Sequence, residues 1–300
     1  MANVYEIVTE KIITQLQQGT VPWRKPWQCE PPVNLVSQKA YRGINPFLLT
    51  PQGYGSRYWL TYAQATRLGG HVRKGEKSSI VTFWNIGEER TRRMPDGSDK
   101  KQRPILLRFY NVFNLEQTEG IAEKLGVTTS PRVPNIEACE AIVANMPHAP
   151  GREQSHRAWY RPSTDTVGMP GKALFDNPQA YYSTLFHELT HSTGHASRIG
   201  RDGIEHLNTF GSESYSKEEL VAELGAAMLC GVTGISPATI DNSASYLQNW
   251  INALKGDSKL LISAASQAQK AADYIRNVKP EDKAGPEQTE HVEVTGHESF

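Results

Sequence analysis

The chain has 300 residues, of which 38% are hydrophobic, and its 32 Lys and Arg balance its 32 Asp and Glu. This length and composition suffice for one or two packed domains. No apolar run approaches the roughly 20 residues of a membrane-spanning helix, so we expect no membrane association. The three cysteines stand apart without a Cys-x-x-Cys pair, which argues against a disulfide framework and favours the reducing cytoplasm.

Charge is distributed unevenly along the chain. Residues 1–130 contain 18 Lys and Arg against 11 Asp and Glu, whereas residues 131–300 contain 14 against 21. A basic half joined to an acidic half predicts an anionic partner for the first half alone. An accidental segregation of charge is the competing interpretation.

Helical and strand patterns both occur in the first 130 residues. Apolar residues at helical spacing predict an N-terminal helix that stops at Gly19, and Thr61 can cap a short helix that ends at Gly69. The β-branched and aromatic runs at 78–85 and 104–114 predict strands. The polar segment between these runs predicts a long hairpin loop that turns at 95–97.

Basic and aromatic residues interleave densely in this half. Cations that follow phosphates and aromatic rings that stack on bases hold single-stranded nucleic acid. Aromatic residues at strand spacing more often build a core, and we interpret Trp84, Phe109 and Phe113 in that way. No recognition helix or zinc finger is visible, so single strands are favoured over duplex DNA. The candidate DNA-binding residues are Trp23, Arg24, Lys25, Trp27, Arg42, Arg57, Arg73, Lys74 and Lys77.

A change of pattern marks a domain junction. Around residues 117–135 the apolar period is lost and prolines appear, whereas helical patterns dominate from Asn135 onward. The polar end of the chain predicts a disordered tail. The expected organisation is a single-stranded-DNA-binding domain at 1–130, a second domain at 131–278 and a tail at 279–300.

The stretch LFHELTHSTGH, at residues 185–195, contains the pattern His-Glu-x-x-His. Asn177 followed by Pro178 marks the start of a helix, because an asparagine side chain caps the first turn and proline suits its first position. No helix breaker follows until Gly194. The pattern is therefore expected on a helix.

On that helix two histidines can share one metal ion. His187 and His191 project from one face, one turn apart, at a spacing that suits zinc. Glu188 points about 100° aside, where it could take the proton of a zinc-activated water. A chance match on a surface helix is the alternative, and a chance match would need no third ligand.

A third protein ligand is expected from a later helix. The extended pattern His-Glu-x-x-His-x-x-Gly-x-x-His fails, because Ser197 occupies its last position. The stretch SKEELVAELGAAML offers Glu218, Glu219 and Glu223 instead. Glu219 and Glu223 share one face of an otherwise apolar segment, so one can bind zinc while the other supports a motif histidine. The pattern Glu-x-x-Ala-Glu resembles the third-ligand pattern of zinc peptidases, which favours Glu219 as the ligand and Glu223 as its support.

Three protein ligands plus water form an open zinc site, which suits amide hydrolysis. The segment 165–170, just before the motif helix, can form a strand. In zincins such a strand lines the cleft and pairs with an extended peptide, so a peptide or protein substrate is expected.

Several stretches resemble one known family. VPWRKPW, YRGIN, YWLTYAQATRLGGHVRKGEK and FYNVFNLEQTEG are similar to the N-terminal domain of ArdC-type antirestriction proteins and plasmid TraC-type DNA primases. LFHELTHSTGH followed by EELVAELGAAML resembles the zincin-like metallopeptidase domain of ArdC-type proteins. The likeness covers nearly the whole chain except its last twenty or so residues.

The resemblance implies an α+β fold, with an α+β nucleic-acid-binding domain before a mainly helical zincin-like domain that has a small sheet. It also implies a protein of conjugative plasmids that binds single-stranded DNA and protects incoming DNA from restriction. The first hypothesis for function is a DNA-tethered zinc protease. The second is a protein that shields single strands without catalysis, with a structural or regulatory metal site.

Overall fold

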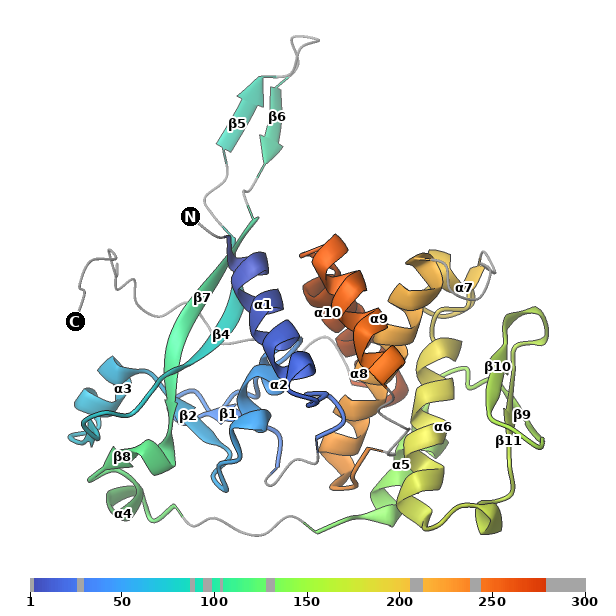
Figure 1. The fold of residues 1–300 in the computed structure, drawn as a ribbon, viewed down its shortest axis with the longest axis horizontal. Coiled ribbons are helices and arrows are strands. Elements are labelled where there is room, and N and C mark those ends of the chain that lie inside the picture. Colours follow the sequence, from blue (N-terminus) through green and yellow to red (C-terminus); the bar gives the residue numbers. More distant parts are fainter. Residues whose placement is uncertain are drawn as a thin grey trace.

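The computed structural model describes residues 3–25, 30–86, 90–93, 99–102, 105–127, 133–205, 213–237 and 244–278. The fold is α+β, with an N-terminal group of strands and short helices beside a mainly helical C-terminal group (Figure 1). Trp27, the turn at 95–97 and the expected tail at 279–300 lie outside the described residues.

The N-terminal group is built on a four-stranded sheet of order β1-β2-β7-β4. Its strands are β1 (Val33–Asn34), β2 (Tyr58–Leu60), β4 (Ser79–Ile86) and β7 (Ile105–Asn114). The two long strands pair antiparallel from Ser79 opposite Val112 to Ile86 opposite Ile105. The two strands therefore form the expected hairpin, but the connector, expected as a loop, contains its own two-stranded ladder, β5 (Arg90–Arg93) with β6 (Asp99–Gln102).

The predicted helices of this group have the capping residues that the sequence indicates. Helix α1 (Val4–Gln17) starts with a capping box of Asn3 and Glu6, and Gly19 follows it at a φ of 76°. Helix α3 (Tyr62–Arg67) starts at Thr61 with a capping box that includes Gln64. The remaining short elements are α2 (Asn45–Leu49), β3 (His71–Val72), β8 (Thr118–Glu119), α4 (Ala122–Leu125) and the 3-10 turns Thr50–Gln52 and Leu115–Gln117.

The C-terminal group packs helices around the motif helix. Its helices are α5 (Ile136–Asn145), α6 (Pro178–Ser192), α7 (Asp202–Glu205), α8 (Glu213–Thr233), α9 (Ala244–Gly256) and α10 (Leu260–Ile275). A three-stranded sheet of β9 (Gly151–Gln154), β10 (Trp159–Arg161) and β11 (Thr166–Met169) lies beside α6, with 3-10 turns at Pro162–Thr164 and Lys172–Leu174. The expected mainly helical second part with a small sheet is confirmed.

Close packing brings α6 and α8 together. Gly225 on α8 faces Thr190 on α6, and a Cβ at residue 225 would come within 2.6 Å of the threonine side chain. Only glycine leaves room for this approach, because such a separation lies well inside van der Waals contact. The close crossing places the two helices that carry the candidate metal ligands side by side.

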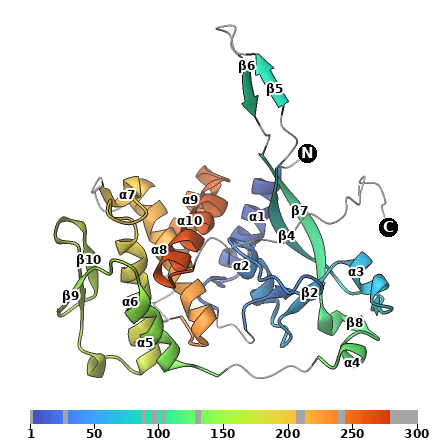
Figure 2. The same cartoon turned by 180° about the vertical axis from the view of Figure 1, so that it is seen from behind.

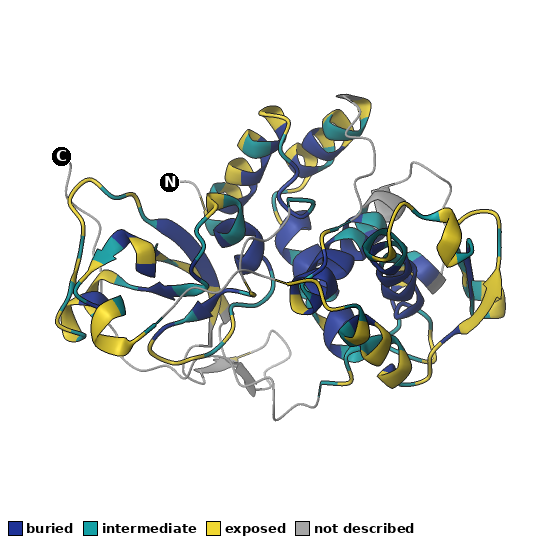
Figure 3. Cartoon of the chain, turned by 90° about the horizontal axis from the view of Figure 1, so that it is seen from below, coloured by how far each residue is buried: buried dark blue, intermediate teal, exposed yellow. Residues whose placement is uncertain are grey.

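The two groups share one hydrophobic core. The largest cluster of buried side chains includes Ile12 and Leu16 of α1 together with Trp250 and Leu254 of α9, and α1 packs against α9 (Figures 1 and 2). Buried residues run through the middle of the molecule where these helices meet (Figure 3). Residues 1–130 therefore bury part of their apolar surface against the C-terminal helices.

None of the three sheet aromatics expected in the core is buried. Trp84 and Phe109 are 46% and 41% exposed, and Phe113 is half-buried. Trp84 contacts the ring of Tyr5 on α1. Among the described residues, no helix is long and apolar enough to cross a membrane.

Candidate metal centre

The expected signals set the bounds of helix α6. The Asn177 side chain accepts a hydrogen bond from the backbone NH of Ala180 at 2.9 Å, and Pro178 is the first helical residue. The helix ends at Ser192, and Gly194 follows it. The His-Glu-x-x-His pattern therefore lies in the last two turns of a well-capped helix.

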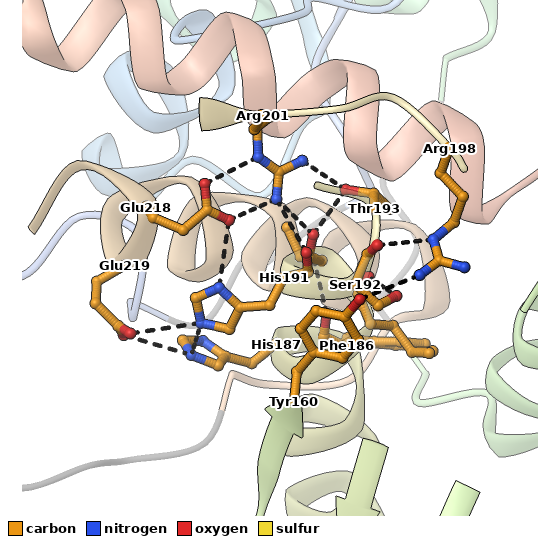
Figure 4. Close-up of polar contacts among 12 residues, drawn as sticks. Tyr160, Phe186, His187, His191, Ser192, Thr193, Arg198, Arg201, Glu218 and Glu219 are labelled. Atoms are coloured by element: carbon orange, nitrogen blue, oxygen red, sulfur yellow. Dashed lines mark hydrogen bonds and ion pairs between the residues drawn. The ribbon is translucent and has the colours of Figure 1, made fainter. Parts of the chain in front are cut away.

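Three side chains from two helices converge next to that pattern. The Nε2 atoms of His187 and His191 are 3.1 Å apart. The carboxylate of Glu219 on α8 lies 3.6 Å from Nε2 of His187 and 3.5 Å from Nε2 of His191 (Figure 4). These three residues form a group that could hold a metal ion.

The spacing of these atoms suits a small divalent ion. Two ligand atoms at about 2.0–2.1 Å from one tetrahedral zinc ion are about 3.3–3.4 Å apart. The separations of 3.1, 3.5 and 3.6 Å lie close to that value. Two imidazole nitrogens and one carboxylate oxygen are also a common ligand set of open zinc sites.

Glu188 lies beside this group and is nearly buried, with 8% of its surface exposed. Burial raises the pKa of its carboxyl group, and the neighbouring His187 and His191 partly oppose that shift. Within the described part of the chain, no side chain donates a hydrogen bond to this carboxylate, so its oxygens are available to a substrate or to water.

A buried carboxylate orients one of the histidines. Nδ1 of His191 is 3.3 Å from Oε1 of Glu218, which leaves Nε2 facing the other ligands. Arg201 donates to both oxygens of Glu218, at 2.5 and 2.9 Å. Burial opposes ionisation of Glu218, but the Arg201 hydrogen bonds outweigh it and hold the pKa below its usual range. Glu218 thus acts on His191 as outer carboxylates act on the histidine ligands of metal sites.

The same carboxylates act on the charge of His191. Burial lowers the tendency of the ring to bind a proton, but hydrogen bonds to Glu218 and Glu219 outweigh burial and raise the pKa of His191 to about 10. The histidines also hold the pKa of Glu219 well below its usual range, although burial opposes this. The Glu219 carboxylate therefore stays ionised, as a metal ligand must be.

Two arginines close the C-terminal end of α6, where helix carbonyls lack partners. Arg201 donates to the carbonyl of Thr190 at 2.8 Å, and Arg198 donates to that of Ser192 at 2.7 Å. Arg198 also pairs with Asp165, which precedes β11. These contacts tie the motif helix to the small sheet.

The strand expected at 165–170 is confirmed as β11, but its predicted pairing with a peptide is wrong. It is the central strand of its sheet, with β10 antiparallel on one side and β9 parallel on the other. A peptide cannot add to a strand whose two edges are already paired. A peptide would have to use β9 or β10.

Glu223 does not support a motif histidine, so that prediction is wrong. Its carboxylate accepts hydrogen bonds from Trp23 Nε1 at 2.7 Å, from Arg24 Nη2 at 2.6 Å and from the Tyr246 hydroxyl at 2.6 Å. Glu218, one residue before Glu219, has the role that the sequence assigned to Glu223. Position 223 lies one turn farther along α8, beside the N-terminal segment.

The structure divides the candidate DNA-binding residues into those that are buried or paired within the protein and those that are exposed. Trp23 is 1% exposed and Arg24 is buried against Glu223, so neither can meet a base or phosphate in this conformation. The other residues with protein partners are Lys25, which donates to the Pro51 carbonyl, Arg42, paired with Asp273, and Arg57, paired with Glu30. Arg73, Lys74 and Lys77 are exposed, with Arg73 paired to Glu76.

Comparison with known proteins agrees with this architecture. Residues 137–267 match the family of zincin-like metallopeptidases, and residues 2–113 match the N-terminal domain of the anti-restriction factor ArdC. The fold and the His-Glu-x-x-His helix therefore define a zincin-like metallopeptidase domain joined to an ArdC-type N-terminal domain.

Relatives that match this chain over nearly their whole length identify its family. The chain is 38% identical to the crystallised antirestriction protein ArdC of plasmid R388 in its metal-free form, with a TM-score of 0.73 over 92% of this chain and 97% of that one. The Mn(II)-bound form of that protein gives a TM-score of 0.70. The protein y4eC of Sinorhizobium fredii is 35% identical, over 91% of each chain. This chain belongs to the ArdC antirestriction family.

A DNA primase contains the same region. The DNA primase TraC of Escherichia coli is 38% identical in an alignment 292 positions long, which covers 90% of this chain and 20% of the primase. A second TraC primase is 36% identical, and this chain spans 27% of its length. The chain thus corresponds to about a fifth to a quarter of these primases.

Proposed function

We propose that this protein binds single-stranded DNA during conjugation and carries a catalytic zinc site that hydrolyses a peptide bond in a host or restriction-related protein. The convergence of His187, His191 and Glu219 beside the buried Glu188 carries the proposal. The similar antirestriction protein of plasmid R388 supports it, because that protein also crystallised in an Mn(II)-bound form.

His187, His191 and Glu219 would hold the metal. A bound divalent ion would act as a Lewis acid that polarises a substrate carbonyl and lowers the pKa of water. Glu188, adjacent to these ligands, would accept the proton of the attacking water and return it to the leaving amine. Glu218 and Arg201 would keep the His191 ring in the orientation that presents Nε2.

The first prediction concerns metal content. Purified His187→Ala and Glu219→Ala proteins should lose the bound metal, because each lacks one of three ligands, whereas Glu188→Ala should retain it. Elemental analysis after dialysis against equal zinc and manganese tests both the ligand set and the preference for zinc. Full metal occupancy in Glu219→Ala would disprove the three-ligand site, and retention of manganese in preference to zinc would reject the zinc assignment.

The second prediction separates catalysis from shielding. The Glu188→Ala protein should fold and bind metal but protect incoming DNA poorly in a conjugation assay into a restricting recipient, because it lacks the proposed base. The number of transconjugants, relative to a non-restricting recipient, measures protection. Glu137→Ala, at an exposed glutamate on α5 outside both the metal group and the basic half, provides the matched control.

The alternative function is shielding of single strands without catalysis. The charge of the N-terminal half supports it, because phosphate binding needs no hydrolysis. Unchanged protection by Glu188→Ala would favour this alternative and leave the metal site a structural or regulatory role. Loss of protection with unchanged DNA affinity would favour the protease.

A further inference from the structure

The two long strands of the N-terminal sheet have different faces. Because side chains alternate along a strand, Phe83 on β4 shares a face with Arg108 and Tyr110 on β7, whereas Trp84 and Phe109 lie on the other face. Helix α1 packs on the second face, where Tyr5 contacts Trp84. We call Phe83, Leu106, Arg108 and Tyr110 the outer face.

The outer face exposes an ordered pair of aromatic rings. Phe83 and Tyr110 stack with their ring centroids 4.2 Å apart and their planes 19° from parallel. Tyr110 also packs against a small core that includes Val81 and Val112, so the stack has a rigid base. Phe83 remains 37% exposed, and Leu106 beside it is 54% exposed. A fixed and exposed ring of this kind is what a nucleobase needs for stacking.

Positive charge accompanies these rings. Arg108 lies directly opposite Phe83 in the β4–β7 register and is exposed. At one end of the strands, the turn before β4 carries the exposed Lys74 and Lys77.

The other end of the strands continues into a basic hairpin. Figures 1 and 2 show β5 and β6 projecting beyond β4 and β7. Their sequences, Arg-Thr-Arg-Arg and Asp-Lys-Lys-Gln, contain five cations and one acid. The aromatic stack thus lies between two basic segments, an arrangement that complements a phosphate backbone.

We propose that the outer face is a binding site for single-stranded DNA, in which a base stacks on Phe83 and Arg108 contacts a phosphate. The strand would run from the turn with Lys74 and Lys77 toward the β5–β6 hairpin. Single strands fit this face better than duplex DNA, because a duplex hides the faces of its bases. This site rests on the proposed function, which requires that the protein binds single-stranded DNA.

The test uses the full-length protein and a labelled oligothymidine of about 20 nucleotides. Phe83→Ala should weaken binding about 5- to 150-fold, the loss expected for one stacked base, with little change in salt dependence. Arg108→Gln should weaken binding and reduce the slope of log affinity against log salt by about 0.7, the value for one phosphate contact. Phe109→Ala is the matched control, because Phe109 is similarly exposed on the opposite face.

The outcomes separate this site from the proposed function. If the wild-type protein does not bind the oligonucleotide, the proposed function fails and the site with it. If the wild type binds and Phe83→Ala and Arg108→Gln bind equally well, only the outer-face site is rejected. An effect of Phe109→Ala as large as that of Phe83→Ala, or tighter binding of duplex, would also reject it. Circular dichroism and melting curves establish that each variant is folded.

Discussion

Replacing Glu223 with alanine should lower the free energy of unfolding by about 3–5 kcal/mol, the usual loss when one partner of a buried ion pair is removed. Arg24 and Glu223 expose only 8% and 9% of their side chains, and their closest atoms are 2.6 Å apart. Without the carboxylate, the Arg24 guanidinium would keep its charge in a site with little access to water. Trp23 and Tyr246 would also lose an acceptor.

A more exposed pair provides the matched control for this prediction. Arg73 and Glu76 also lie 2.6 Å apart, but they expose 42% and 25% of their side chains. Glu76→Ala should therefore cost much less stability than Glu223→Ala, as is usual for pairs that water screens. Urea unfolding of both variants, with a chelator present so that metal binding does not contribute, gives the comparison. Equal losses for the two variants would contradict the role given to burial.

The Arg24–Glu223 pair connects two parts of the chain that have different proposed roles. Glu223 lies one turn beyond Glu219 on α8, and Arg24 belongs to the basic N-terminal half. Arg42 with Asp273 forms a second link, to α10. Because the halves also share a core, DNA binding is best measured on the full chain and not on residues 1–130 alone.

The motif helix could be predicted from the sequence because its signals are local. An N-cap side chain, a proline at the first position and a glycine after the end act within one or two turns. The pairing of His187 with His191 also follows from helical spacing alone. For the same reason the capped starts at Asn135 and Thr61 were predictable.

The partner of His191 could not be predicted in this way. Glu218, Glu219 and Glu223 all lie on α8, and spacing shows only which of them share a face. Which glutamate meets a histidine depends on how α6 crosses α8, and Gly225 sets that crossing by its contact with Thr190. Glu218 also needs Arg201, which lies outside both helices. Their pairing is a property of the folded chain.

For a similar reason, the sequence alone could not identify which basic residues are free to bind DNA. A cation at the surface and a cation in a buried pair look the same in a sequence when the partner is distant. The partner of Arg24 lies 199 residues away, and that of Arg42 lies 231 residues away. The density of basic and aromatic residues therefore indicated a class of ligand, but it did not separate Trp23 and Arg24 from the exposed Lys74 and Lys77.

Replacing Glu218 with alanine should weaken metal binding about 10- to 100-fold without abolishing it, as expected for a residue that orients a ligand. The His191 ring would lose the acceptor at Nδ1 that keeps Nε2 directed at Glu219 and His187. The same change leaves the Arg201 charge buried without its carboxylate, which should cost about 3–5 kcal/mol of stability. A zinc titration with a competing chelator, together with urea unfolding, measures both effects.

Two further variants distinguish orientation from ligation. Glu218→Gln keeps an oxygen that can accept from Nδ1, so it should recover part of the metal affinity but less of the stability, because Arg201 still lacks a charged partner. Glu219→Ala should lose the metal altogether, because the Glu219 carboxylate lies within 3.6 Å of both Nε2 atoms. The adjacent residues Glu218 and Glu219 would then have different roles. Glu219 would contact the ion, and Glu218 would act on it through His191. If Glu218→Ala and Glu219→Ala lost the metal equally at saturating zinc, Glu218 would itself have to be a ligand, and the division between them would be wrong.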